Sequence, residues 1–297
     1  MVAAGLRLAV VAAAFFCAAG ARGEINASDA TPTPLERIPF YNLQGMPVIQ
    51  VQVHNRPPES FVLDTGARPC VLDAAYAKEL GLSTSKQRTG QGGGGAFSAD
   101  VIAGPLELRI AGRALRCEET LSTDLSGVSK SIQRKIHGII GGDFFRGRVV
   151  IIHYDDSVID VHERAAYRYR GRGARIPMEV KGNRPYLIAR LSVAGRENVP
   201  RALLIDTGSQ DWIADSLLQE STDQLKGARG TGLGPGFDTK SGTFTRVVIG
   251  PHEFTDVPGV IPAVPIVGAG LLSNFNLTFD YDGAWLVMDR RESGRTR

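Results

Sequence analysis

The sequence predicts an all-β protein with few short helices, built from two similar halves. Residues 139–161 align without a gap with residues 266–288, which indicates an internal repeat. Glycine supplies 35 of the 297 residues, more than its usual share of about 7%, and no Gly-X-Y period accompanies it. Turn-rich chains of this kind are typical of all-β folds. Helix signals are scarce, and we expect short helices only at 73–80, 129–135 and 214–219.

A second pair of segments precedes the aligned ones and defines the start of each half. Pro47 and Pro185 each open an extended run, which continues through a polar turn into an apolar run ending in Asp-Thr-Gly. The halves are therefore placed at 38–170 and 171–290. The Gly- and Arg-rich segment 168–174 between them is interpreted as a solvated connection, because charge runs usually mark exposed chain.

The two Asp-Thr-Gly motifs are Asp64-Thr65-Gly66 and Asp206-Thr207-Gly208. An alternative interpretation is a simple polar turn, in which Asp bonds the backbone and Gly takes a positive φ. Each motif, however, follows an apolar run rather than a polar cluster. A carboxylate at the end of a buried strand is unfavourable unless it is paired or hydrogen-bonded. Two such carboxylates at equivalent places therefore indicate a shared function.

A third element completes each half: Ile139-Ile140-Gly141 in the first and Ile266-Val267-Gly268 in the second. With the Asp-Thr-Gly motifs, these elements resemble the aspartic proteases, and most closely the single-chain, retropepsin-like proteins exported by bacteria. The resemblance covers about residues 40–290. It implies a two-lobed acid-protease fold with pseudo-twofold symmetry, in which Asp64 and Asp206 meet as the catalytic pair.

The same resemblance assigns supporting roles. Thr65 and Thr207 would brace the two Asp loops, and the strands carrying Gly141 and Gly268 would pass beneath them. Gly66, Gly208 and Ser209 complete the supporting loops.

The chemistry fits the residues independently. Two adjacent carboxylates share one proton, so one can activate water while the other donates to a peptide carbonyl. We expect no metal and no cofactor, and a peptide or protein as substrate. Ala67 has no hydroxyl to stabilise an ionised carboxylate, which predicts a raised pKa for the pair and a mildly acidic pH optimum.

A glycine-rich stretch, 89–97, lies between the first Asp-Thr-Gly and Gly141, where the family carries a substrate-binding flap. The predicted flap residues are Gly92, Gly93, Gly94, Gly95 and Phe97. Consecutive glycines suit a mobile tip that approaches a peptide backbone. A plain flexible loop is the alternative. The stretch 227–236 occupies the equivalent place in the second half, and whether it forms a second flap stays open.

The amino-terminal residues predict export to the periplasm or the medium. Arg7 precedes an apolar run at 8–19 and small residues suitable for cleavage, so residues 1–23 are interpreted as a signal peptide. A short uncleaved anchor is the alternative, although the run is shorter than the roughly 20 residues of a membrane span. Residues 24–37 are a linker or short pro-segment, and 291–297 are a basic tail.

Charge and cysteine content limit the partners. The formal charge is +3 with 34 basic and 31 acidic residues, which gives no reason to expect a nucleic-acid partner. After signal cleavage we expect no stable membrane insertion, and a monomer suffices for a complete site. Cys70 and Cys117 remain in the mature chain; two buried thiols are favoured over a disulfide, because sequence cannot supply the Cα separation.

Two other functions are alternatives to an aspartic protease. Ser83-Thr-Ser-Lys86 and Lys240-Ser-Gly242 resemble motifs of penicillin-recognising serine enzymes, but no Ser-x-Asn lies between them and those enzymes lack an internal β repeat. The second alternative is a non-catalytic peptide-binding or assembly module on the same fold.

Overall fold

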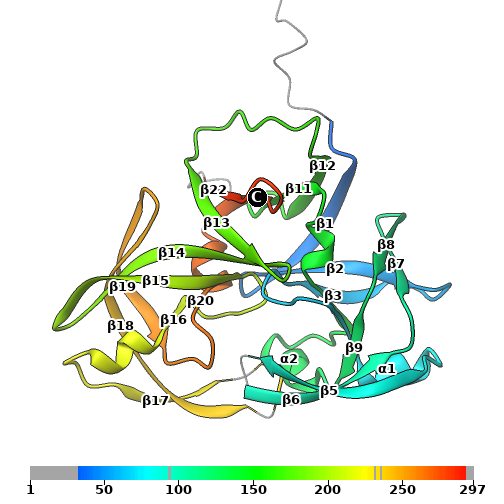
Figure 1. The fold of residues 1–297 in the computed structure, drawn as a ribbon, viewed down its shortest axis with the longest axis horizontal. Helices are drawn as coiled ribbons and strands as arrows, with labels where there is room; N and C mark the ends of the chain where they lie inside the picture. The colour runs from blue at the N-terminus through cyan, green and yellow to red at the C-terminus, as the bar shows by residue number, and fades with distance from the viewer. Residues whose placement is uncertain (1–32, 93–94, 231, 235, 292–297) are drawn as a thin grey trace, which may run out of the picture. The chain divides into compact units, whose positions relative to one another are not determined.

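The computed structural model describes residues 33–92, 95–230, 232–234 and 236–291. Its described part is composed mostly of β-strands with short helices, which confirms the all-β prediction (Figure 1). The predicted signal peptide, residues 24–32 of the predicted linker, Gly93, Gly94 and residues 292–297 of the tail lie outside the described residues. Residues 33–291 belong to one compact unit, so the division into lobes at residue 170 stays a prediction.

The strands of the first half are β1 (Glu36–Leu43), β2 (Met46–Val53), β3 (Glu59–Leu63), β4 (Cys70–Asp73), β5 (Thr84–Gly92), β6 (Gly95–Ile102), β7 (Leu106–Ile110), β8 (Arg113–Cys117), β9 (Thr120–Thr123), β10 (Gly138–Ile140), β11 (Arg148–His153) and β12 (Val158–Glu163). Those of the second half are β13 (Arg175–Lys181), β14 (Arg184–Val193), β15 (Arg196–Asp206), β16 (Ile213–Ala214), β17 (Lys226–Gly230), β18 (Phe237–Ile249), β19 (His252–Val260), β20 (Ile266–Gly268), β21 (Phe275–Asp280) and β22 (Trp285–Arg290).

The helices are short, and two of the predicted ones are displaced or altered. Helix α1 (Ala74–Glu79) lies within the predicted 73–80, and the Asp73 side chain caps it by accepting from two backbone N–H groups. Helix α2 (Ser126–Ser131) begins before the predicted 129–135. The segment predicted at 214–219 is a 3₁₀ turn, η3 (Ser216–Glu220). Two turns that follow the glycine elements, η2 (Gly142–Phe144) and α3 (Ala269–Leu272), were not predicted.

The two halves repeat one pairing pattern. In the first, β3 pairs in parallel with β10, β10 pairs antiparallel with β4, and β4 pairs in parallel with β9. In the second, β15, β20, β16 and β19 pair in the same order and the same directions. Each strand that leads into an aspartate therefore lies beside the strand that carries the glycine element of the same half. This pairing joins segments about 75 residues apart in the first half and about 60 residues apart in the second.

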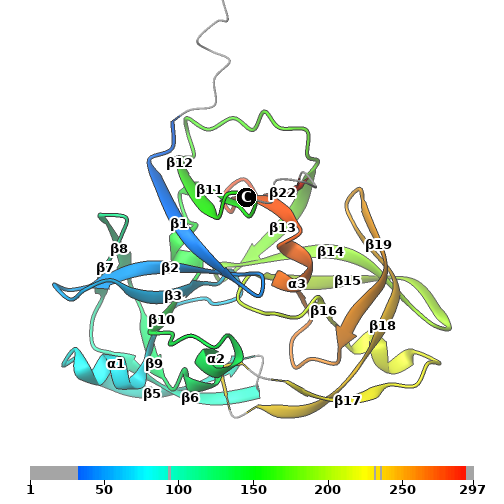
Figure 2. The ribbon, with the colours of Figure 1, turned by 180° about the vertical axis from the view of Figure 1, so that it is seen from behind.

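A six-stranded antiparallel sheet joins the halves, in the order β1, β12, β11, β21, β22 and β13. The pairing of β11 with β21 links the aligned segments of the repeat directly, with Ile151 opposite Thr278. In Figure 2 this sheet lies at one end, while the remaining strands of each half extend to either side of the middle. The connection between β12 and β13 contains the Gly- and Arg-rich segment.

Alternating side chains of the strands build the core. The largest buried cluster draws from both halves and includes Phe145, Phe279 and Tyr281, whose rings contact one another. Burying each such side chain stabilises the fold by roughly 1.5–3 kcal/mol. Because residues of both halves share this cluster, the relative position of the two aspartate-bearing strands is held by apolar packing.

The cysteine prediction is wrong. Cys70 and Cys117 form a disulfide with a Cα–Cα distance of 6.1 Å, rather than remaining as two buried thiols. The strands that carry them, β4 and β8, lie far apart along the chain but meet in the first half. Only the folded chain reveals this separation, which lies within the range that a disulfide can span.

Within the part of the chain that the structure describes, the helices are too short and too polar for any of them to cross a membrane.

Candidate active site

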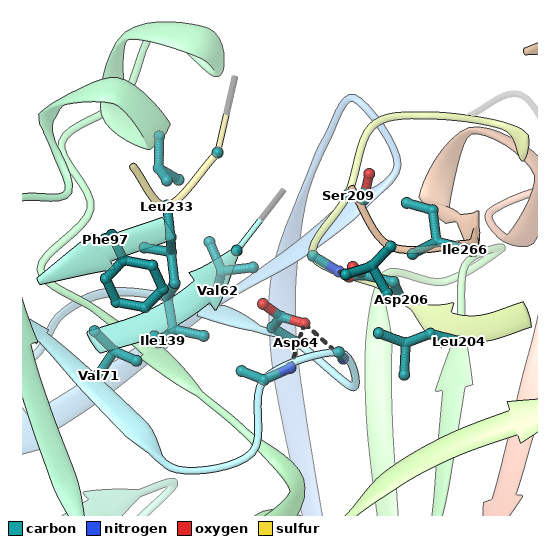
Figure 3. A pocket seen from close by; sticks show the side chains of 18 of the residues that line it. Val62, Asp64, Val71, Phe97, Ile139, Leu204, Asp206, Ser209, Leu233 and Ile266 are labelled. Carbon is teal, nitrogen blue, oxygen red and sulfur yellow. Dashed lines mark hydrogen bonds between the residues drawn. The ribbon is translucent and has the colours of Figure 1, made fainter. Parts of the chain in front are cut away.

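Each aspartate lies at the end of a strand that pairs with a glycine element. Asp64 comes directly after β3, and its backbone N–H donates to the carbonyl of Ile140 at 2.9 Å. Asp206 is the last residue of β15, opposite Gly268 of β20. The three residues before each aspartate are apolar and buried: Phe61, Val62 and Leu63 in β3, and Leu203, Leu204 and Ile205 in β15. The chain therefore delivers both carboxyl groups from rigid, packed strands to one location (Figure 3).

Four hydrogen bonds cross between the two Asp-Thr-Gly loops through the threonines. The Thr65 hydroxyl donates to the Ile205 carbonyl at 2.6 Å, and the Thr207 hydroxyl donates to the Leu63 carbonyl at 2.8 Å. The Thr65 hydroxyl also accepts from the Thr207 backbone N–H at 3.0 Å, and the Thr207 hydroxyl accepts from the Thr65 backbone N–H at 3.1 Å. Both threonines are fully buried. Because leaving any of these groups unpaired would be unfavourable, the network fixes one loop relative to the other.

The glycines of the two motifs allow the carboxyl groups to approach. A Cβ added to Gly66 would lie 2.6 Å from the Asp206 carboxyl carbon, and one added to Gly208 would lie 2.3 Å from that of Asp64. Neither glycine has a positive φ, which argues against the alternative of a simple polar turn. Glycine is needed here because each aspartate occupies the space that the other loop's side chain would fill.

Gly141 and Gly268 support the loops from below. A Cβ on Gly141 would lie 2.7 Å from the Ala67 carbonyl oxygen, and one on Gly268 would lie 2.2 Å from that of Asp211. The next N–H groups bind the same loops: Gly142 donates to Ala67 at 3.0 Å and Ala269 donates to Ser209 at 2.7 Å. The glycine elements thus hold the backbone that carries the aspartates.

The hydrogen bonds around the two carboxylates are unequal. Asp64 accepts from the backbone N–H groups of Gly66 and Ala67 at 2.7 and 3.0 Å. Among the described residues, one backbone N–H donates to the Asp206 carboxylate, that of Gly208 at 2.9 Å. The two carboxyl groups are also hydrogen-bonded to each other. Asp64 is thus the better stabilised as an anion, and Asp206 is the better placed to hold the shared proton.

The pKa values follow this asymmetry. Burial raises the pKa of Asp64, and its hydrogen bonds oppose the rise. The pKa of Asp206 is raised well above its usual value by burial and then by the adjacent negative charge of Asp64. Two adjacent carboxyl groups titrate as a pair. Their shared proton is therefore retained to a higher pH than the proton of an isolated aspartate.

Neither residue after the Asp-Thr-Gly motifs places a hydroxyl on the pair. Ala67 contributes only its backbone N–H. The Ser209 hydroxyl is 3.4 Å from the Asp211 carboxylate and accepts from the Asp211 N–H at 3.3 Å, so it does not bond Asp206. Although Ala67 and Ser209 differ in the sequence, neither residue supplies a hydroxyl to the aspartate pair.

The aspartates lie in a cavity of about 530 Å³. Figure 3 shows apolar side chains on both sides of the pair. Those of the first half are Val62, Val71, Phe97, Leu121 and Ile139; those of the second are Leu204, Phe237, Val260, Val264 and Ile266. The site therefore combines a carboxyl pair with two apolar walls large enough to hold side chains of a peptide.

Two β-hairpins end at this cavity. Strands β5 and β6 form the hairpin predicted as a flap, and Gly92 and Phe97 line the cavity. Strands β17 and β18 form the second hairpin, so the stretch left open by the sequence lines the cavity as well. A Cβ on Gly92 would lie 2.7 Å from the Leu233 carbonyl oxygen, so the hairpins meet (Figures 1 and 2). Each hairpin also contains a cross-strand glycine–phenylalanine pair: Gly90 with Phe97 in the first, and Gly230 with Phe237 in the second.

Sequence reasoning missed several residues near the pair. Tyr281 is buried, stacks on Phe145, and has its pKa raised by burial and by the charges of both aspartates. Its position in the repeat, aligned with Tyr154, was the available signal. Met46 and Arg184, the first residues of β2 and β14, and Arg68, in the loop after β3, also line the cavity. No signal in one sequence places such residues, because their neighbours come from the other half.

The described residues contain no group of three His, Cys, Asp or Glu side chains that could hold a metal ion. Residues 49–144 match the family model described as aspartyl protease. The match includes Asp64 and Gly141 but not the second half, and it supports an aspartic protease assignment at the level of the family. No curated protein matches the chain.

Proposed function

We propose that this protein is an aspartic endopeptidase that hydrolyses peptide bonds with water activated between Asp64 and Asp206. The observation that carries the proposal is the hydrogen-bonded carboxyl pair, held by the reciprocal Thr65 and Thr207 bonds at the floor of an apolar cavity. The aspartyl protease match to residues 49–144 supports the same class.

The unequal surroundings of the pair assign the roles. Asp64, which accepts two backbone N–H bonds, is the carboxylate that takes a proton from water. Asp206 holds the shared proton and donates it toward the carbonyl oxygen of the scissile peptide. Water attacks the carbonyl carbon directly, and the pair returns to one shared proton as the amine leaves. No covalent intermediate is required.

The apolar walls support cleavage between apolar residues. Val62 and Ile139 lie on one side of the pair, and Leu204 and Ile266 lie on the other. Burial of an apolar side chain against either wall contributes roughly 25 cal/mol per Å² of area removed from water. The two hairpins then cover the bound peptide and exclude solvent from the reacting atoms.

Export to the periplasm or the medium is part of the proposal. The residues 1–23 have the composition of a secretory signal. The Cys70–Cys117 disulfide supports an oxidising compartment, because cytosolic thiols are generally kept reduced. Both aspartates belong to one chain, which supports a complete site in a monomer.

The direct test is peptide cleavage by the mature protein between about pH 3 and pH 7, with an apolar peptide library as substrate. We expect cleavage by the wild type, and a loss of at least about a thousandfold in kcat for both Asp64→Asn and Asp206→Asn, because each variant removes one partner of the pair. Retention of the wild-type melting temperature controls for folding.

The alternative, a non-catalytic peptide-binding module, makes the opposite prediction. Wild type and both variants would then bind the same peptides and leave them uncleaved at every pH.

A further inference from the structure

The cavity carries unequal charge at its two ends, and two arginines produce the difference. Arg68 follows the first Asp-Thr-Gly-Ala sequence, and Arg184 is the first residue of β14. Both line the cavity that holds the aspartates. Their role is not accounted for by the chemistry of the carboxyl pair.

The two arginines come from different halves but approach each other at one end of the cavity. The turn between β13 and β14 consists of Gly182 and Asn183, and a Cβ on Gly182 would lie 3.3 Å from Cδ of Arg68. The Asn183 carbonyl packs against Gly142, beside the loop that carries Arg68. This hairpin therefore brings Arg184 to the Arg68 side of the cavity.

The corresponding positions at the other end are neutral. Met46 opens β2 after the turn of Gln44 and Gly45, as Arg184 opens β14, and that turn contacts Ala269 of the second half. Gln210 follows the second Asp-Thr-Gly-Ser sequence, as Arg68 follows the first. Met46 and Gln210 both line the cavity. One end thus carries two guanidinium groups where the other carries a thioether and an amide.

Neither guanidinium is neutralised within the described part of the chain. Arg184 is half-buried, and its Nε is buried without a hydrogen-bond partner there. Its guanidinium lies 6.0 Å from the ring centre of Tyr186, which supports the side chain without supplying an acceptor. Arg68 is exposed and forms no ion pair with a described carboxylate. The neighbouring carboxylate, Asp143, accepts from Asn183 at 2.9 Å.

The other two arginines of the cavity differ in this respect. Arg88 forms an ion pair with Glu119 at 2.6 Å, and Arg229 lies 3.9 Å from Asp238. Both therefore have carboxylate partners of their own. A buried guanidinium N–H without an acceptor is unfavourable, and a planar guanidinium binds a carboxylate through two parallel hydrogen bonds. Arg68 and Arg184 are the cations left to bind a ligand.

We propose that Arg68 and Arg184 form an anion subsite that selects peptides carrying a carboxylate on one side of the scissile bond. The carboxylate is supplied by an Asp or Glu side chain or by the carboxyl terminus of a short peptide. This inference rests on the proposed peptidase function, since it places the subsite beside the reacting carboxyl pair. The opposite end, with Met46, Gln210 and the Asp211 carboxylate, offers no corresponding guanidinium and does not select a carboxylate.

The test compares matched peptides that share an apolar pair at the scissile bond. Each flanking position carries either Glu or Gln, and each peptide is made with a free or an amidated carboxyl terminus. We expect the wild type to cleave the Glu peptide at one position with kcat/KM at least about tenfold above that of its Gln partner, the effect of a charge-assisted hydrogen bond. A preference for the free terminus over the amide would instead assign the carboxylate to the peptide end.

Two variants test the arginines. Arg68→Gln and Arg184→Gln should each lower the preference for the carboxylate mainly through KM, while cleavage of the uncharged peptide continues. Arg184→Glu should reverse the preference in favour of a Lys peptide. The matched control, Arg246→Gln, removes a cation that has its own carboxylate partner, Glu253, and lies outside the cavity lining, so it should keep the wild-type preference.

A binding measurement separates this inference from the proposed function. Labelled Glu and Gln peptides are titrated with the Asp206→Asn variant, with and without Arg184→Gln, and binding is followed by fluorescence anisotropy. Selective binding of the carboxylate without any cleavage by wild type would reject the peptidase function and retain the subsite. Equal cleavage of the two peptides by wild type, with equal binding of both by Asp206→Asn, would overturn the subsite and leave the peptidase function intact.

Discussion

Each aspartate of this site lies where a side chain on the opposite loop would otherwise be. The Cβ positions of Gly66 and Gly208 fall on the carboxyl groups of Asp206 and Asp64. Glycine is required at both positions because there is no space for a side chain, and not because either residue has a positive φ. A methyl group at either glycine must therefore displace a carboxyl group.

We expect Gly208→Ala to lower kcat by at least about a hundredfold while the protein remains folded, because a displacement of about 1 Å at a catalytic group is enough for a loss of this size. The measurement is steady-state cleavage of an apolar peptide, with circular dichroism as a check of folding. Gly227→Ala is the matched control: it adds a methyl group with no atom within 4 Å and outside the cavity lining. Equal activity of the two variants would contradict the steric explanation.

The pKa values of the pair predict a weakly acidic optimum. The proposed mechanism requires one proton shared by the two aspartates. The raised pKa of Asp206 keeps that proton to higher pH, and the raised pKa of Asp64 moves the acid limb upward as well, so both limbs shift away from strong acid. The check is the pH profile of kcat/KM; a sharp maximum near pH 2 would be inconsistent with it. In Ala67→Ser, an added hydroxyl that donates to Asp64 should move the acid limb to lower pH.

Among the elements, the crossed threonines hold the two Asp-Thr-Gly loops together and contribute to the stability of the fold. Thr207→Val removes a hydroxyl that donates to Leu63 and accepts from the Thr65 N–H, and it leaves both partners buried. We expect a loss of about 2–4 kcal/mol in the free energy of unfolding, since each unpaired buried group costs about 1–3 kcal/mol. Urea unfolding measures it.

Thr207→Ser serves as the control because it keeps the hydroxyl. It should retain most of the stability, and a loss as large as that of the valine variant would show that packing of the methyl group is responsible instead.

The second hairpin, β17–β18, lines the cavity together with the first, β5–β6. The glycine-rich stretch 89–97 predicts a flap. The similar composition of 227–236 does not by itself decide whether that stretch forms a second flap. The contact between Gly92 and Leu233 brings both tips to one cavity. Leu233 also packs against the buried cluster of the first half that includes Met46 and Val62, as Phe97 does. Covering of the site is thus shared between the halves.

For the molecule as a whole, the disulfide restricts the unfolded chain. Cys70 and Cys117 are separated by 47 residues. Closing a loop of this length should stabilise the fold by about 2–4 kcal/mol through the lost entropy of the unfolded state. We expect the double variant Cys70→Ser, Cys117→Ser to melt at a lower temperature and to match the reduced wild type.

Cleavage by the folded double variant at low temperature should remain, because neither cysteine lines the cavity. An equal melting temperature for oxidised wild type and double variant would contradict the stabilising role.

Much of the architecture could be predicted from the chain. The repeat, the apolar runs before Asp64 and Asp206, and the scarcity of helix signals predicted β-strands that end at two aspartates, because strand pattern and turn chemistry are local properties. The displaced α2 and the turns η2 and α3 could not be predicted, since short helices depend on tertiary contacts more than on propensity.

The sequence alone determined which residues recur in both halves, and hence that two Asp-Thr-Gly motifs and two glycine elements act together. The tertiary structure decided which atoms meet. It unites Cys70 with Cys117, places two backbone N–H groups on Asp64 against one on Asp206, and gathers Arg68 and Arg184 at one end of the cavity. These outcomes depend on distances between residues far apart along the chain, and such distances are set only when the strands pack.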